Sequence, residues 1–120
     1  MDWTIWLVLG VVILGFMALK RASFVKVESA RQMLRENARI VDVRTESEFR
    51  SQHVPGAINV PLSELEDRIV REIPDKGQVL LVHCLSGGRS AIAQGKLRKL
   101  GYTKVHNLGS LGRAMKVARA

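Results

Sequence analysis

Cys84 is the only cysteine of the 120-residue chain, and it lies in the stretch VHCLSGGRS, residues 82–90. Two glycines follow it closely and let the backbone curl so that successive N–H groups point inward, which makes a concavity that binds anions. Arg89 adds a full positive charge, and a helix beginning near Ser90 adds the positive end of its dipole. Each of these features lowers the pKa of a thiol. The pattern therefore favours a thiolate nucleophile beside an anionic substrate over an inert buried cysteine.

The segments around this stretch predict an α/β fold. Apolar or alternating runs typical of strands occupy residues 24–27, 39–43, 78–83 and 104–108, with a shorter one inside 53–61. Helical patterns occupy residues 28–37, 45–49, 62–73 and 90–101, with Ser29, Thr45 and Ser63 as N-caps, Gly101 as a stop signal and one more helix in the tail. Strands that alternate with helices imply a parallel sheet with helices on both faces. Ligand sites of such sheets form where the carboxyl end of a strand leads into a helix, and Cys84 lies at such a junction.

A charge-free apolar run precedes these segments. As a helix with a rise of ~1.5 Å per residue, the run from Trp3 to Leu19 spans roughly 25 Å, the short end of what crosses a bilayer. We therefore predict a transmembrane anchor over residues 1–21, followed by a single domain over residues 22–120. The alternative is a cleaved signal peptide, but the sequence has neither a basic leading segment nor a small-x-small cleavage site at the expected places.

The charges around this run predict its orientation. Lys20, Arg21 and Lys26 follow the run and Asp2 precedes it, so the positive-inside rule places the domain in the cytoplasm, at the inner or plasma membrane. A single cysteine excludes an intramolecular disulfide and fits a reducing compartment. We therefore expect a single-pass membrane protein whose soluble domain faces the cytoplasm.

The formal net charge of +8 raises the question of an anionic partner. No aromatic residues are interleaved with the basic ones and no nucleic-acid-binding motif is present, so we expect no nucleic acid partner. Anionic lipid of the cytoplasmic leaflet, or plain solvation, accounts for the charge equally well. The sequence also has no Cys pair and no closely spaced His pair, so no metal site is expected.

Two stretches resemble the rhodanese (sulfurtransferase) family. VHCLSGGRS resembles the active-site loop of these domains, Cys-x-x-Gly-x-Arg-Ser, and IVDVRTESEFRSQHVPGAINVP, residues 40–61, resembles their second characteristic stretch; the resemblance covers roughly residues 24–112. It implies a parallel sheet with helices on both sides. It also implies that the cysteine takes a sulfane sulfur as a persulfide from an anionic donor, such as thiosulfate or another persulfide. The sulfur then passes to cyanide or to a thiol of a small molecule or a protein, without a cofactor.

The family's functional residues carry over onto matching positions. The resemblance makes Cys84 the nucleophile, and it makes a cradle for the anionic sulfur from the backbone N–H groups of Leu85, Ser86, Gly87, Gly88, Arg89 and Ser90. The side chain of Arg89 matches a substrate-binding cation, although a role as an ion-pair partner at the helix start is equally consistent. Asp42 and Arg44 match a pair that braces the neighbouring loops. His83 alternates to the face opposite Cys84, so a Cys–His dyad is not expected.

Two other functions are open at this point. Dual-specificity phosphatases and arsenate reductases also place a cysteine in an anion cradle, but their loop has five residues between Cys and Arg, and only four separate Cys84 from Arg89. Rhodanese-like modules without catalysis serve as binding or regulatory domains, and these usually lack the cysteine. The tail departs from the family pattern: Gly109-Ser110 and Met115 lie where a Gly-Gly pair and a tryptophan are usual, which leaves the acceptor preference open.

Overall fold

The computed structural model describes residues 2–119, apart from the side chains of residues 20–22. Four parallel strands form one sheet in the order β2-β1-β3-β4. The strands are β1 (Arg39–Asp42), β2 (Ile58–Asn59), β3 (Leu80–His83) and β4 (Val105–Gly109). The helices are α1 (Trp3–Ala22), α2 (Val27–Arg35), α3 (Glu46–Ser51), α4 (Leu65–Glu72), α5 (Gly88–Lys99) and α6 (Leu111–Ala118), and a 3-10 turn, η1 (Leu62–Glu64), precedes α4. The parallel α/β architecture predicted from the sequence is confirmed.

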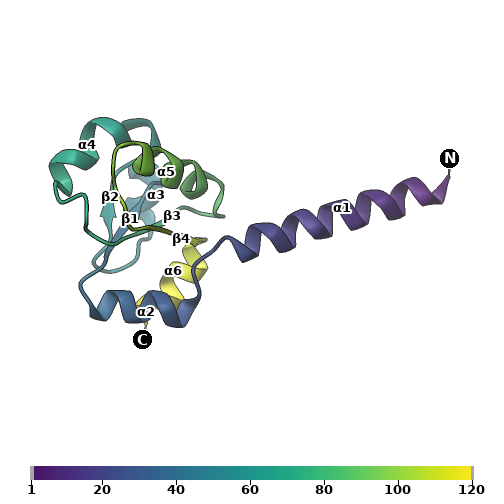
Figure 1. The fold of residues 1–120 in the computed structure, drawn as a ribbon, viewed down its shortest axis with the longest axis horizontal. Coiled ribbons are helices and arrows are strands. Elements are labelled where there is room, and N and C mark those ends of the chain that lie inside the picture. The colour runs from purple at the N-terminus through teal and green to yellow at the C-terminus, as the bar shows by residue number, and fades with distance from the viewer. Residues whose placement is uncertain (1, 120) are drawn as a thin grey trace.

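Helices cover both faces of the sheet (Figure 1). On one face, α4 and α5 pack with Leu80 and Val82 in a buried apolar cluster. On the other face, α2 and α6 pack with Leu81 in a second cluster. Neighbouring residues of β3 enter different clusters because successive side chains of a strand point to opposite faces. Since both faces are covered, β3 is buried at every position and its sequence is apolar up to His83.

Local hydrogen bonds set the ends of several helices near Cys84. The Thr45 side chain accepts a hydrogen bond from the Glu48 N–H, and the Glu48 carboxylate accepts one from the Thr45 N–H, so the predicted capping box of α3 is confirmed. The Ser110 hydroxyl accepts a hydrogen bond from the Arg113 N–H and caps α6. Gly101 follows α5 with a φ of +103°, the left-handed conformation that ends many helices.

Residues 24–27 do not form the strand that their alternation predicts. The Val25 N–H donates to the carbonyl of Asn107 in β4, and α2 already begins at Val27. The two serines predicted as N-caps are also placed wrongly. Ser29 lies inside α2, and Ser63 lies inside η1, which begins after Pro61. Proline fixes its own φ and starts the turn ahead of the serine.

α1 projects away from the sheet (Figure 1), and its large apolar side chains from Trp3 to Leu19 are exposed. Within the described residues, no helix is both long enough and apolar enough to cross a membrane. The transmembrane anchor predicted for residues 1–21 is therefore not supported. The side chains of Lys20 and Arg21, on which the predicted orientation depends, lie outside the described residues.

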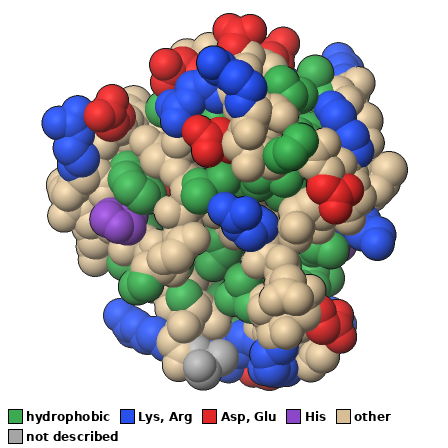
Figure 2. Space-filling view, turned by 90° about the vertical axis from the view of Figure 1, so that its left-hand side faces the viewer, with side chains coloured by type: hydrophobic (Ala, Val, Ile, Leu, Met, Phe, Trp, Pro, Cys, Tyr) green, Lys and Arg blue, Asp and Glu red, His purple; other side chains and the backbone are tan. Residues whose placement is uncertain are grey.

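Charges of both signs are mixed on the surface. Figure 2 shows the face turned away from α1, where Lys and Arg side chains lie next to Asp and Glu side chains around small apolar patches. Exposed ion pairs such as Arg50–Glu46 and Lys96–Glu66 show the same mixing at the level of single contacts. On this face the net positive charge is not gathered into one basic patch.

Candidate active site around Cys84

Cys84 directly follows β3 at the carboxyl end of the sheet. Its N–H donates to the Gly109 carbonyl at the end of β4 (N···O 3.1 Å), which ties the residue to β4 as well as to β3. The residue is 1% exposed and belongs to the apolar cluster shared with α4 and α5. Burial by itself disfavours a thiolate, so the polar groups around the sulfur decide how readily it ionises.

Backbone and hydroxyl groups of the loop face this sulfur. The Gly87 N–H donates to Sγ of Cys84 (N···S 2.9 Å), and the Ser90 hydroxyl oxygen lies 3.6 Å from Sγ. Ser90 Oγ also lies 2.7 Å from Oδ1 of Asn107. Burial raises the pKa of the Cys84 thiol, but the hydrogen bond between Sγ and the Ser90 side chain, together with those from the backbone N–H groups of Ser90, Gly87 and Ser86, outweighs burial. The pKa of Cys84 is therefore lowered from its ordinary value.

The conformation of the loop depends on Gly87. Its φ of +104° lies in the left-handed region that residues with a Cβ atom rarely adopt. Gly87 is the N-cap residue of α5, so the helix begins at Gly88, two residues earlier than its sequence pattern indicates. Ser86 pairs with Ser110 at the start of α6. All six residues predicted for the cradle, 85–90, lie in the turn and first helical residues that join β3 to α5. The Gly87 N–H donates to Sγ, and the N–H groups of Ser86, Gly87 and Ser90 lower the pKa of the thiol.

Arg89 lies in the first turn of α5, and a carboxylate binds its guanidinium. Nη1 and Nη2 donate to Oε1 and Oε2 of Glu48 at 2.6 and 3.0 Å. The Arg89 hydrogen bond lowers the pKa of Glu48 from 4.5 to about 2, and the pKa of Arg89 is raised by the same bond. The stabilisation from this pair is present above the ordinary pKa of Glu48 and is lost as the pH falls through about 2. The structure thus contains the ion pair at the helix start, and substrate binding by Arg89 stays a prediction.

Asp42 and Arg44 form a buried ion pair beside the loop. Arg44 Nη2 donates to Oδ2 of Asp42 and to the Gln52 carbonyl, both at 2.7 Å, and the two charged side chains are 0% and 3% exposed. The pair therefore ties the end of β1 to the segment ahead of β2. His83 Nδ1 lies 3.0 Å from the Cys84 carbonyl oxygen, and Nε2 lies 3.6 Å from Oδ2 of Asp42. The His83 ring thus contacts the backbone of Cys84, and desolvation lowers the pKa of this ring.

Sequence reasoning missed two side chains of the site, Asn107 and Phe24. Asn107 Oδ1 accepts hydrogen bonds from the Ser90 hydroxyl and from the Gly109 N–H, which holds the hydroxyl next to the sulfur. A methyl group added to Gly87 would lie 2.6 Å from Cζ of Phe24, so the aromatic ring covers this glycine. Both contacts join residues far apart in the chain, and no short-range pattern signals either of them.

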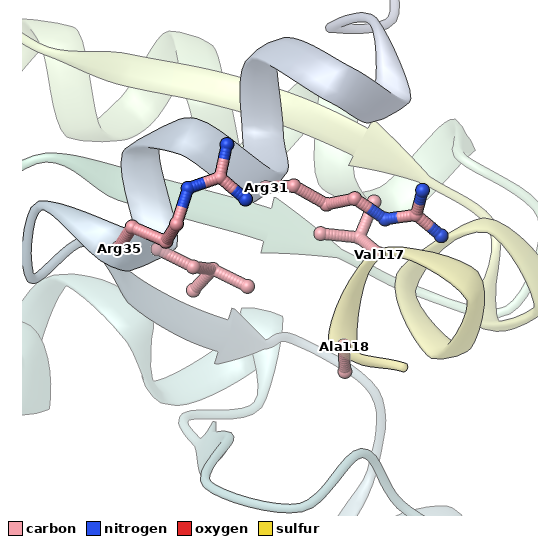
Figure 3. A pocket seen from close by; sticks show the side chains of 5 residues that line it. Arg31, Arg35, Val117 and Ala118 are labelled. Atoms are coloured by element: carbon pink, nitrogen blue, oxygen red, sulfur yellow. The ribbon is translucent and has the colours of Figure 1, made fainter. Parts of the chain in front are cut away.

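A separate pocket lies between α2 and α6. Figure 3 shows Arg31 and Arg35 extending from α2, with Val117 and Ala118 on α6. The helices that form it cover the face of the sheet opposite the cluster that contains Cys84. No residue of the cysteine loop lines this pocket, so the pocket is not part of the candidate active site around Cys84.

The lowered pKa of Cys84 predicts a pH dependence of alkylation. Iodoacetamide reacts with the thiolate, so its rate should rise with pH through a midpoint below the ~8.5 of an ordinary thiol. Ser90→Ala should move the midpoint upward, because the Ser90 side chain gives the largest lowering contribution. Intact mass spectrometry of samples quenched across a pH series measures both. A wild-type midpoint at or above ~8.5 would contradict an activated thiol.

Comparison of the sequence with known proteins identifies the family of this chain. Residues 26–111 match the rhodanese-like domain. Relatives include the thiosulfate sulfurtransferase PspE of Escherichia coli strain K12, 42% identical over 71 residues, which are 59% of this chain and 68% of that protein. The putative sulfur carrier protein YrkF of Bacillus subtilis strain 168 is 36% identical over 73 residues, which are 61% of this chain and 38% of that protein.

Solved structures show the same fold. A rhodanese from E. coli, described with anions, is 39% identical, superposes with a TM-score of 0.61, and the match covers 63% of this chain and 89% of that one. The human single-domain sulfurtransferase TSTD1 is 30% identical, with a TM-score of 0.63 and coverage of 75% and 89%. The family match spans well over half of the sequence and includes the cysteine loop. This chain therefore belongs to the rhodanese-like domain family.

Proposed function

We propose that this protein is a rhodanese-type sulfurtransferase that moves a sulfane sulfur through a persulfide on Cys84. The observation that carries the proposal is the N–H of Gly87, 2.9 Å from Sγ, in a loop that lowers the pKa of the thiol. Relatives named as sulfurtransferases support sulfur transfer in general. The donor and the acceptor are part of the proposal.

In the first step, the Cys84 thiolate attacks the outer sulfur of an anionic donor such as thiosulfate or a persulfide. A new S–S bond forms at Sγ, the donor's S–S bond breaks, and sulfite (or a thiolate) leaves with the bonding electron pair. The persulfide left on Cys84 carries a negative charge. The inward N–H groups and the N-terminus of α5 stabilise this charge as they stabilise the thiolate. The step needs no proton transfer once the thiolate has formed.

In the second step, a thiolate or cyanide attacks the terminal sulfur of the persulfide. The S–S bond breaks, and Cys84 leaves as a thiolate that is ready for the next cycle. A thiol acceptor departs as a persulfide and cyanide departs as thiocyanate. A thiolate of lowered pKa is the better leaving group, so the same hydrogen bonds assist both steps.

Thiocyanate formation tests this proposal. The full chain, given thiosulfate and cyanide, should produce thiocyanate over many turnovers, and Cys84→Ser should produce none above the uncatalysed rate. Ser90→Ala should retain part of the rate, since it removes one of several groups that act on the sulfur. If the wild-type protein forms no thiocyanate and no persulfide product with a thiol acceptor, the sulfurtransferase proposal fails.

Arg89 gives a prediction about donor charge. The Arg89 side chain is about a third exposed and lies in the first turn of α5, so we expect its guanidinium to bind the charge of an incoming donor. Arg89→Ala should raise the KM for doubly charged thiosulfate about tenfold and should affect a neutral donor much less. Glu48→Gln is the matched variant, because it removes the carboxylate but keeps the cation, and it should not raise the KM for thiosulfate. An equal loss for charged and neutral donors would assign Arg89 to structure alone.

The cellular location of the protein is a separate proposal that rests on the sequence alone. We propose that the chain lies at the inner or plasma membrane with residues 22–120 in the cytoplasm, because basic residues follow the charge-free run. Protease should spare these residues in intact spheroplasts and digest them in inverted vesicles. Digestion in spheroplasts, or recovery of the full chain in the soluble fraction, would contradict this location.

A further inference from the structure

The segment between α1 and α2 packs against the loop that carries Cys84. The Val25 N–H donates to the Asn107 carbonyl (N···O 2.9 Å), and the Arg113 guanidinium donates to the carbonyls of Val25 and Leu108. The same guanidinium lies 5.2 Å from the centre of the Phe24 ring. Figure 1 shows this segment passing beside β4 and α6. The backbone next to Phe24 is thus held in place, and so is the ring.

The ring of Phe24 closes the space above two glycines. A methyl group on Gly87 would lie 2.6 Å from Cζ of Phe24, and one on Gly109 would lie 2.9 Å from Cδ2 and Cε2. Both glycines have positive φ values, +104° and +89°. Each of them holds the cysteine: the Gly87 N–H donates to Sγ of Cys84, and the Gly109 carbonyl accepts from the Cys84 N–H. Phe24 therefore rests on the two residues that hold Cys84 at its sulfur and at its backbone.

We propose that Phe24 is a positioning residue that holds the Gly87 N–H against the sulfur of Cys84. Glycine has more conformational freedom than any other residue, so a glycine N–H keeps its direction only where its surroundings leave no other space. The ring fills that space. An N–H···S bond to an anionic sulfur is charge-assisted, and its strength falls as its geometry relaxes. The part of this inference that concerns turnover rests on the proposed sulfurtransferase function, whereas the part that concerns the thiol does not.

We expect the charged groups around the cysteine loop to remain in place when Phe24 is changed. The charged and titratable side chains around the cysteine loop are Arg89, Glu48, Asp42, Arg44, His83 and Arg113. Arg113 contacts the ring itself, but its hydrogen bonds to two backbone carbonyls hold it independently of the ring. A change in the titration of Cys84 then reports on the loop and its N–H groups.

The test is Phe24→Ala in the full chain, with two readouts. The midpoint of iodoacetamide alkylation should move upward toward the ~8.5 of an ordinary thiol. Thiocyanate turnover should fall about tenfold, as expected for a weakened charge-assisted hydrogen bond. Phe24→Leu keeps apolar bulk over the glycines, so its alkylation midpoint and its thiocyanate turnover should both lie close to those of the wild type. Phe49→Ala is the matched control, because Phe49 is also half-buried but stacks on His53, and it should change neither readout.

The outcomes separate this inference from the proposed function. An alkylation midpoint that is unchanged in Phe24→Ala overturns the positioning role, even if the wild type transfers sulfur. A raised midpoint in a protein that transfers no sulfur supports positioning and refutes the proposed function. If Phe24→Ala shows no cooperative unfolding transition, Phe24→Leu decides the question: a small upward shift supports positioning, and no shift overturns it.

Discussion

Gly87→Val should abolish sulfur transfer while the chain still folds. The φ of Gly87 is +104°, which a β-branched residue strongly resists, and the new Cβ would lie 2.6 Å from Cζ of Phe24. The loop must therefore shift, and the N–H that lies 2.9 Å from Sγ shifts with it. We expect thiocyanate turnover to fall by more than about 100-fold, the size of the loss when a preorganised N–H group leaves an anionic centre.

Gly56→Val is the matched control for this prediction. Gly56 also has a positive φ, +82°, but an added Cβ would meet nothing within 4 Å. Valine at this position should cost stability through backbone strain alone and should leave turnover close to that of the wild type. Circular dichroism shows whether each variant folds, and the thiocyanate rate shows whether the loop is intact. Normal turnover in Gly87→Val would mean that the inward N–H group has no role in the reaction.

Asp42→Asn should destabilise the fold strongly. Both partners of the Asp42–Arg44 pair are buried, and the change leaves the Arg44 guanidinium without its counter-charge. Breaking a buried pair on one side costs ~3–5 kcal/mol, which is a large part of the ~5–15 kcal/mol that holds a typical domain together. Urea unfolding followed by circular dichroism measures this loss in the free energy of unfolding.

An exposed pair provides the comparison. Arg50 and Glu46 on α3 form an ion pair whose side chains are 72% and 70% exposed, so Glu46→Gln should cost less than ~1 kcal/mol. If the two variants unfold at the same urea concentration, the Asp42–Arg44 pair is not the brace between β1 and the segment ahead of β2. Asp42→Asn should affect turnover only through the loss of folded protein, because neither charge contacts Sγ by a hydrogen bond in the structure.

The local structure near Cys84 could be predicted from the sequence. The apolar run before Cys84 and the glycines after it define a strand, a turn and a helix within one short window, and each has its own local cause. The capping box of Thr45 and Glu48 is also local, because its two residues are three positions apart. These interactions lie within about one turn of chain, where spacing and residue type carry the signal. The same kind of signal was wrong for Ser29 and Ser63, which lie inside their helices instead of capping them.

Contacts between distant segments could not be predicted in this way. Glu48 looks like a capping residue, and only the fold brings it to Arg89, 41 positions further along the chain. Phe24 belongs to an alternating run that resembles a strand, but the Val25 N–H donates to Asn107 in β4, and the Phe24 ring lies against Gly87 and Gly109. Tertiary contacts overrode the local preference here, as they often do in short alternating runs.

Intact mass after incubation with thiosulfate tests the central claim most directly. The purified chain, freed of excess donor, should gain the mass of one sulfur atom, and a thiol or cyanide should then remove it. Cys84→Ser should gain nothing under the same conditions, since Cys84 is the only cysteine in the chain. A wild-type protein that never gains the sulfur, from thiosulfate or from a persulfide donor, would contradict a persulfide on Cys84 and with it the proposed sulfurtransferase.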